Sequence, residues 1–420
     1  MTMTESTTVY YDMYDREIYR DPYETFRRLR NEAPVYYNEK LNFYALSHHD
    51  DLFQVLRDRD TFISGKGMVY NIISKDIEMP PGLFINEDPP EHTMHRAIVS
   101  RLFTPRAVSG LEPQIRKLCD EIVDGLVGLD HFDFMRDFSL QLPVQVIGML
   151  VGVPKKDQAD LLAIFQKNLH EGSADPDQAL IQGILDSAAW FNEYLDWREK
   201  NPSDDVMTQL LQFEFEDDTG TMRTLRRDEI VTYLTLITTA GSDTTATGIS
   251  WAGSLLSDHP DQRRELVANP GLIPHAMEEV LRYEPPSYHF CRWTTKDVEF
   301  HGTTIPAESI LVVLPPAANR DESKWEDPER FDIHREPAQI FTFSFGPHFC
   351  LGANLARLEA RIALETILPR IPDWRSTTTT RTSPKASTRA GGRSCPSPSA
   401  DWLYSSGHDS YVARPSSARP

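Results

Sequence analysis

Most of this 420-residue chain carries the apolar periodicity of α-helices, which limits the folds that it can adopt. Apolar residues recur at helical spacing in residues 22–34 and, beyond Glu91, in a series of further segments. Those segments are residues 92–102, 107–126, 141–151, 176–200, 227–256, 274–283 and 351–368. Residues 35–47 and 298–321 alternate instead with the period of strands around a turn. The pattern predicts a mainly α fold with a smaller β region, and it shows no fixed-period repeat of the kind that builds solenoids or propellers.

Charge and cysteine content exclude several classes of function. The chain has 43 Lys and Arg against 63 Asp and Glu, so it should repel nucleic acid and anionic membranes. Its four cysteines lie far apart without CxxC spacing, which argues against a disulfide framework or a zinc ribbon and favours a reducing compartment. The first residues form no signal peptide, and no run of roughly eighteen apolar residues follows. We therefore expect a cytoplasmic protein without a membrane anchor.

One of these cysteines, Cys350, stands just before the predicted helix of residues 351–368. A thiolate at a helix N-terminus is stabilised by the macrodipole and by backbone N–H groups that lack helical partners. Gly346 and Gly352 allow the backbone to bend and to approach a flat partner closely. Apolar surface is supplied by Phe343, Phe345 and Phe349. These features suit a soft metal ligand beside an aromatic macrocycle, whereas a cysteine considered alone is more often simply a buried thiol.

The ten residues FSFGPHFCLG match the pattern F-x-x-G-x-[RH]-x-C-x-G, and here the sequence resembles the cytochrome P450 family. The matching positions are Phe343, Gly346, His348, Cys350 and Gly352. The resemblance covers about residues 10 to 375 and implies the P450 fold as a single large domain. It also implies haem b (iron protoporphyrin IX) as the cofactor, with Cys350 as the axial thiolate, His348 on a haem propionate, and the other three residues in the cofactor site.

A second motif, LITTAGSDTTATG, interrupts the apolar pattern of residues 227–256. Because Ser, Thr and Asp compete for backbone hydrogen bonds, the stretch can mark a helix end followed by a new N-cap. Alternatively, a small residue admits a flat cofactor, and a Thr hydroxyl bonded back to a carbonyl opens a local groove. The segment is similar to the family's [AG]-G-x-[DE]-T-[TS]. That similarity implies that Ala240 and Gly241 lie beside the haem and that Asp243 and Thr244 relay protons during dioxygen activation.

Glu279 and Arg282 lie three residues apart on one predicted helix. From spacing alone they form a solvated ion pair that contributes about 0.2 to 0.5 kcal/mol. They also match the family's E-x-x-R motif, and the resemblance implies that Arg330, in PERF, completes a structural Glu–Arg–Arg cluster.

His92 and Arg96 project from one face of the helix predicted for residues 92–102. Together with His95 they can simply decorate a wet surface. A metal site built from these histidines is disfavoured, because no carboxylate or third ligand has suitable spacing. The resemblance instead assigns His92 and Arg96, joined by Arg292, to the haem propionates.

The resemblance places a substrate over the haem face opposite Cys350. The residues expected there are 68–87, Leu236, Ile237, Ala240 and 285–290, which are mostly apolar or aromatic, with Tyr288 and His289 as polar groups. We therefore expect a lipophilic small molecule as substrate. On the other face, Arg357 and Arg361 either bind an acidic ferredoxin or form an ordinary solvated helix face.

The implied activity is that of a haem-thiolate monooxygenase. Such an enzyme inserts one oxygen atom from O2 into its substrate, by hydroxylation or epoxidation, with electrons from NAD(P)H delivered through ferredoxin and ferredoxin reductase. Two alternatives stay open, a peroxide-using variant and a haem-binding sensor or carrier. Neither GxGxxG nor a P-loop occurs, so dinucleotide binding by the chain itself is not expected.

Composition changes after Trp374, where residues 376–420 become rich in Ser, Thr and Pro. The family normally ends with a β element that closes part of the substrate pocket, and nothing of that kind follows here. We expect a disordered or aberrant tail, which would impair monooxygenase activity, and hypothesise that the reading frame was altered near Arg375. Translation of the gene in its other two frames tests this. The predicted parts are an N-terminal extension (1–20), a haem-thiolate domain (21–375) and the tail.

Overall fold

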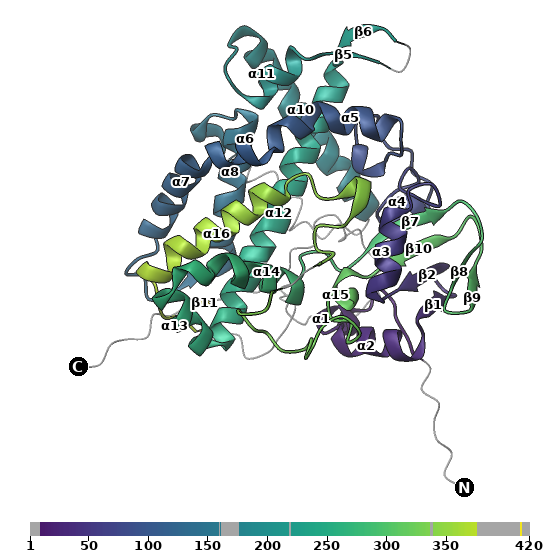
Figure 1. Cartoon of the computed structure of the whole chain (residues 1–420). Helices are drawn as coiled ribbons and strands as arrows, with labels where there is room; N and C mark the ends of the chain where they lie inside the picture. Colours follow the sequence, from purple (N-terminus) through teal and green to yellow (C-terminus); the bar gives the residue numbers. More distant parts are fainter. Residues whose placement is uncertain are drawn as a thin grey trace, which may run out of the picture.

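A long helix, α12 (Arg227–Asp258), runs through the helical part of the molecule (Figure 1). The computed structural model describes residues 9–158, 160, 176–217, 220–336, 339–375 and 412–413. In it, α12 contacts α8 (Gln141–Val151), α10 (Pro176–Lys200), α14 (Ile273–Tyr283) and α16 (Ala353–Arg370). Because apolar residues cover most of its circumference, α12 is stable only when other helices enclose it.

Shorter helices complete the helical part and lead into the β region. They are α1 (Arg16–Arg20), α2 (Tyr23–Glu32), α3 (His49–Arg57), α4 (Tyr70–Ser74), α5 (Glu91–Ser100), α6 (Pro105–Gly110), α7 (Glu112–Asp124), α11 (Val206–Leu211), α13 (Pro260–Ala268) and α15 (Pro315–Ala318). A π-helical turn (Phe134–Ser139) precedes α8 and packs on α12. The largest cluster of buried apolar side chains lies among these helices.

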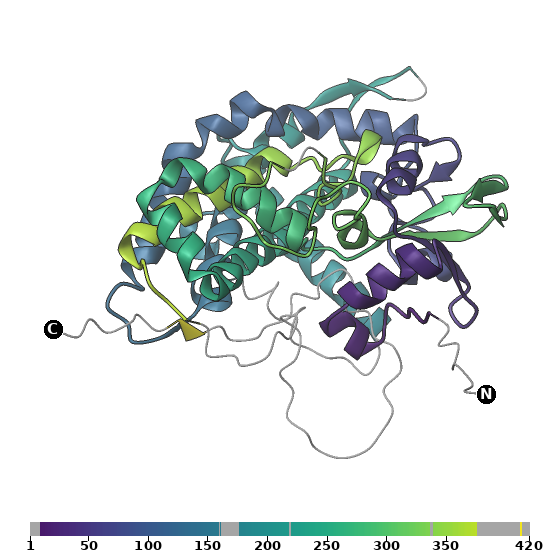
Figure 2. The same cartoon turned by 60° about the horizontal axis from the view of Figure 1, so that its bottom comes forward.

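The β region lies to one side of the helices, as Figures 1 and 2 both show. Its main sheet has the strand order β1-β2-β10-β7-β3, with β10 parallel to β2 and the other neighbours antiparallel. These strands are β1 (Val35–Asn38), β2 (Phe43–Leu46), β3 (Phe62–Ile63), β7 (Phe290–Thr294) and β10 (Ile310–Val313). Separate pairs join β5 (Glu214–Glu216) to β6 (Met222–Thr224), β8 (Val298–Phe300) to β9 (Thr303–Ile305), and β4 (Phe132–Asp133) to β11 (Val412–Ala413).

The mainly α fold with a smaller β region is confirmed, and several predicted bounds agree with the structure. One predicted helix, residues 107–126, is instead two helices, α6 and α7, that meet at Leu111. Pro113 lies in the first turn of α7, where its missing N–H is tolerated; further inside a continuous helix it would remove a hydrogen bond. Helices α3 and α13 and the β5–β6 hairpin were not predicted from the sequence.

Part of the predicted N-terminal extension packs against the neighbouring elements. Val9, Tyr11 and Met13 are buried in the same apolar cluster as Phe26 of α2 and Phe43 of β2. Most of the tail predicted to be disordered, residues 376–411 and 414–420, lies outside the described residues. Within the described part of the chain, none of the helices combines the length and apolar character that crossing a bilayer requires.

Candidate functional site

Cys350 lies at the end of a tight loop, three residues before α16 begins. Its backbone N–H donates to the carbonyl of Phe343 at 2.8 Å, which closes the loop. Gly346 has a φ of +69°, and a Cβ at this position would lie 2.4 Å from the carbonyl oxygen of Leu56 at the end of α3. Only glycine fits there. Gly352, in contrast, has open space beside it, because a Cβ at this position would meet no described atom within 4 Å.

The Cys350 residue is exposed on one side, which leaves its sulfur accessible to a ligand. Dense packing around the rest of the residue desolvates the sulfur and raises the pKa of the thiol. The backbone N–H groups of Gly352 and Ala353 and the nearby Arg96 and Arg357 oppose this shift in pKa. The helix end therefore favours the thiolate, as predicted, but its effect is smaller than that of desolvation.

Four basic side chains gather beside this loop, and all four were predicted at the cofactor site. His92 and Arg96 come from α5 and Arg292 from β7, while the His348 ring lies 4.2 Å from the His92 ring, centre to centre. Burial and repulsion from Arg292, His92 and Arg96 lower the pKa of His348 to about 2. His92 is itself buried, and so is His95, so the interpretation of these histidines as a wet surface is wrong.

None of these four side chains forms an ion pair with an acid among the residues that the structure describes. Arg292 is 4% exposed, donates to the carbonyl of Cys291, and has its pKa lowered to about 10 by burial. Arg96 donates to the carbonyl of Phe349. The Nε2 atom of His92 is buried without a hydrogen-bond partner in the described structure. Because a buried cation such as Arg292 normally needs a counter-charge, and the buried Nε2 of His92 needs a hydrogen-bond partner, the cluster is suited to bind an anionic group with more than one acceptor.

Ala240 and Thr244 form an exposed stripe on α12 between mostly buried neighbours. The Thr244 hydroxyl donates to the carbonyl of Ala240 at 2.9 Å, which confirms the predicted back-bonded threonine. The helix runs unbroken through this segment, as the pattern of residues 227–256 predicts, so the alternative of a helix end followed by a new N-cap is wrong. Asp243, beside Thr244, is half-buried.

Gly241 lies where α12 packs against α8. A Cβ at this position would lie 2.7 Å from Cδ1 of Ile147, so the glycine allows α8 to pack closely on α12. This contact explains the small residue without any cofactor, and a place for Gly241 beside the haem stays a prediction.

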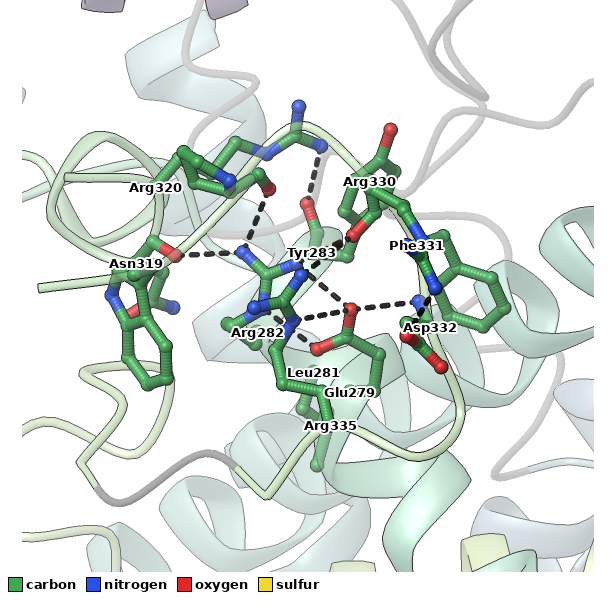
Figure 3. A network of polar contacts seen from close by, with 12 residues as sticks. Glu279, Leu281, Arg282, Tyr283, Asn319, Arg320, Arg330, Phe331, Asp332 and Arg335 are labelled. Atoms are coloured by element: carbon green, nitrogen blue, oxygen red, sulfur yellow. Dashed lines mark hydrogen bonds and ion pairs between the residues drawn. The ribbon is translucent and has the colours of Figure 1, made fainter. Parts of the chain in front are cut away.

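Glu279 and Arg282 form a fully buried, bidentate pair, with nitrogen to oxygen distances of 2.7 and 2.9 Å (Figure 3). The prediction that Arg330 is the third partner is wrong. The Arg330 side chain is exposed and pairs with Asp332, and only its backbone carbonyl accepts from Arg282. Arg335 donates to Glu279 instead, at 3.2 Å. The turn that brings the backbone N–H of Asp332 onto Glu279 directs Arg330 outward.

Arg357 and Arg361, predicted at a docking face, line a cleft of about 740 Å³ between α6, α14 and α16. Arg357 pairs with Glu278 and lies over the Phe343 ring, and Arg361 pairs with Glu112. Their charges are therefore already compensated, which weakens the expected attraction for an acidic partner.

On the proposed substrate side, Leu236 and Ile237 are largely buried in α12. The Tyr288 ring stacks on Tyr19 at 5.1 Å, so this predicted polar group is engaged within the protein. No group of three or more His, Cys, Asp or Glu side chains in the described ranges is arranged to hold a metal ion.

Comparisons with known proteins agree on one family. The family model described as Cytochrome P450 matches residues 161–270 and 271–386. The protein called Putative cytochrome P450 123, from Mycobacterium tuberculosis, is 35% identical over 371 residues, covering 86% of this chain and 90% of that protein. Cytochrome P450 CYP107DY1 from Priestia megaterium is 36% identical over 327 residues, 77% of each chain. Among solved structures, cytochrome P450 CYP109Q5 from Chondromyces apiculatus superposes with a TM-score of 0.78 at 33% identity, covering 97% of this chain and 96% of that one.

Proposed function

This chain belongs to the cytochrome P450 family, and from that premise we propose that it hydroxylates or epoxidises a lipophilic small molecule. Family membership makes the protein a haem-dependent monooxygenase. The substrate class, the type of oxygen insertion, and electron supply from NAD(P)H through a ferredoxin and its reductase are the proposal.

The observation that carries the proposal is an accessible cysteine beside four basic side chains that form no ion pair with an acid among the described residues. Haem b has two propionate carboxylates, which need basic partners, and a central iron, which needs a ligand. The residues present can supply both. His92, Arg96, Arg292 and His348 would hold the propionates, and Cys350 would ligate the iron. The space in front of Gly352, where no described atom would meet a Cβ, leaves room for a flat ring. Bound there, haem supplies the activation of dioxygen.

The chain's own residues prepare the site for that chemistry. The backbone N–H groups of Gly352 and Ala353, with Arg96 and Arg357, favour the anionic form of the sulfur. On α12, the Thr244 hydroxyl can exchange its bond to the Ala240 carbonyl for one to a water molecule or a substrate-side oxygen, and so pass on a proton. Asp243, the half-buried residue before Thr244, would return that proton.

The electron donor is proposed at the cleft beside α16. Because Arg357 and Arg361 already pair with Glu278 and Glu112, an acidic ferredoxin would have to displace these glutamates to reach the guanidinium groups. We therefore expect donor binding to weaken only moderately with salt, in contrast to a partner held by free cations.

The reduced, carbon monoxide-bound absorbance spectrum tests the central assignment. The wild-type protein should show a thiolate-ligated haem, and Cys350→Ser should lose that signature while the protein still folds. An unchanged spectrum in Cys350→Ser would reject the ligand assignment.

Substrate class and electron source need a second experiment. Purified protein is screened for haem spin-state shifts against lipophilic compounds, and each compound that shifts the spectrum is tested for product. Product formed with reductase and ferredoxin supports the monooxygenase. Product formed with peroxide alone would favour the peroxide-using variant, and reductant consumption without any product would favour a sensor or carrier.

A further inference from the structure

The carboxylate of Glu87 connects a loop to helix α5 beside the proposed site. Its Oε1 atom accepts the backbone N–H of Gly82 at 2.7 Å. The Nδ1 atom of His95, on α5, lies 2.9 Å from Oε1 and 2.7 Å from Oε2. The carboxylate thus holds the backbone of Gly82 and the side chain of His95 together.

This contact set is well shielded from solvent. The side chains of His95 and Glu87 are 5% and 13% exposed. Tyr233, a fully buried residue of α12, places its ring 6.2 Å from the His95 ring. The same ring faces Gly82, where an added Cβ would lie 3.6 Å away, an ordinary van der Waals distance. Charge-assisted hydrogen bonds in such surroundings are stronger than those on a surface.

Residues 75–87, here called the 75–87 loop, have little structure of their own to hold them in place. Apart from the short 3-10 turn at Phe84–Asn86, this described stretch contains neither helix nor strand. Gly82 adopts a φ of +92° above Tyr233, and its N–H depends on Glu87 for an acceptor. Loss of the carboxylate would leave this N–H and the His95 ring without that partner.

The 75–87 loop borders the open stripe of α12. Tyr233 precedes Ala240 by seven residues and Thr244 by eleven, which places them about 10 and 16 Å further along the helix axis. A bulky molecule lying over that stripe would therefore reach the loop, whereas a small one would not.

We propose that Glu87 is a positioning residue, whose carboxylate clamps the 75–87 loop between α5 and α12 and so sets how firmly a bulky ligand is held beside Ala240 and Thr244. The inference rests on the proposed haem site, although the clamp itself is a property of this chain's own residues. It assigns His95 a role as the partner of Glu87.

Two azoles of different size test the clamp in the haem-loaded protein. Imidazole is small and contacts little besides the iron, whereas clotrimazole fills the surrounding chamber, and spectral titration gives the Kd of each. We expect Glu87→Ala to bind clotrimazole about tenfold more weakly, the effect of losing one charge-assisted contact, with imidazole affinity changed less than about twofold. Glu91→Ala, at the exposed first residue of α5, is the matched control and should match the wild type.

Limited proteolysis gives a readout that needs no haem. Lys75 is exposed at the start of the loop, and trypsin should cut there several times faster in Glu87→Ala than in Glu91→Ala. Equal cleavage together with equal clotrimazole affinity in the two variants would overturn the proposal. So would an equal weakening of both azoles, since that indicates general damage to the haem site.

Glu87→Gln keeps an acceptor for Gly82 but loses the charge, and it carries the test if Glu87→Ala does not fold. We expect it to bind clotrimazole about threefold more weakly, and wild-type affinity with wild-type cleavage at Lys75 would reject the clamp. If the wild-type protein lacks the spectrum of a thiolate-ligated haem, the proposed function is refuted. The rate of cleavage at Lys75 in the Glu87 variants, compared with Glu91→Ala, would still test the clamp in that case.

Discussion

Replacing Arg335 with alanine should destabilise the protein much more than the same change at Arg330, although the motif PERF points to Arg330. Arg335 donates to the fully buried Glu279 at 3.2 Å and to the backbone carbonyls of Glu326, Asp327 and Arg330. Its side chain is 15% exposed. The Arg330 side chain is 63% exposed and pairs with Asp332 alone among the described residues.

The magnitudes follow from these surroundings. Without Arg335, Glu279 keeps two bonds from Arg282 and one from the backbone N–H of Asp332, so its charge stays compensated. The cost is therefore below the roughly 3 to 5 kcal/mol of breaking a buried pair outright. One charge-assisted bond and several partly exposed carbonyl bonds are lost, so we expect about 2 to 4 kcal/mol. Arg330→Ala removes a surface pair and should cost about 0 to 1 kcal/mol.

Urea unfolding of the haem-loaded protein measures the difference. Tryptophan fluorescence and haem absorbance are followed together, and a shift of the midpoint at constant slope gives the change in the free energy of unfolding. Arg330→Ala leaves its backbone carbonyl in place and serves as the matched control. Equal destabilisation by the two variants, or a larger effect at Arg330, would refute the assignment of Arg335 as the third member of the cluster.

Three further predictions concern the site and the sheet side of the molecule. Thr244→Ala should divert reducing equivalents to hydrogen peroxide, measured as peroxide formed per NAD(P)H consumed, and undiminished coupling would count against its proton-passing role. Arg292→Met should speed haem transfer to a haem acceptor about tenfold without destabilising the apoprotein, because the buried cation lacks an acid partner there; a less stable apoprotein would contradict this. The hydrogen bond to Asp321 raises the pKa of His48, so the pair's contribution is complete below about pH 6.5 and fades as the pH rises through the raised value. His48→Gln should therefore lose more unfolding free energy at about pH 5.5 than at about pH 8.5, and a pH-independent difference would argue against it.

Periodicity predicted those parts of the fold in which local pattern and packing agree. The bounds of α8 and α10 match the predicted residues 141–151 and 176–200 because apolar spacing and enclosure coincide there. The break at Leu111 depends on Pro113, which a periodicity count passes over. The β5–β6 hairpin was missed because Met222 and its neighbours are exposed and carry little apolar alternation.

The candidate site was predictable where a residue type and its spacing suffice. Cys350 and the four basic groups were predicted from the family resemblance, and the structure brings them close to one another. Arg335 was not predicted, because the choice between Arg330 and Arg335 depends on a turn at Asp332 that sequence spacing does not reveal. The pairing of His95 with Glu87 was also missed. Burial decides whether a histidine faces water or a carboxylate, and sequence spacing does not reveal burial.

Gly346 bears on how this protein can be re-engineered. The missing methyl group at that position lets the cysteine loop rest directly on the carbonyl of Leu56, so the two backbones are already in hard contact. A variant library that aims to retune the environment of the sulfur should keep this residue fixed, retain Phe345, whose ring packs on Phe53 of α3, and diversify the exposed Phe349.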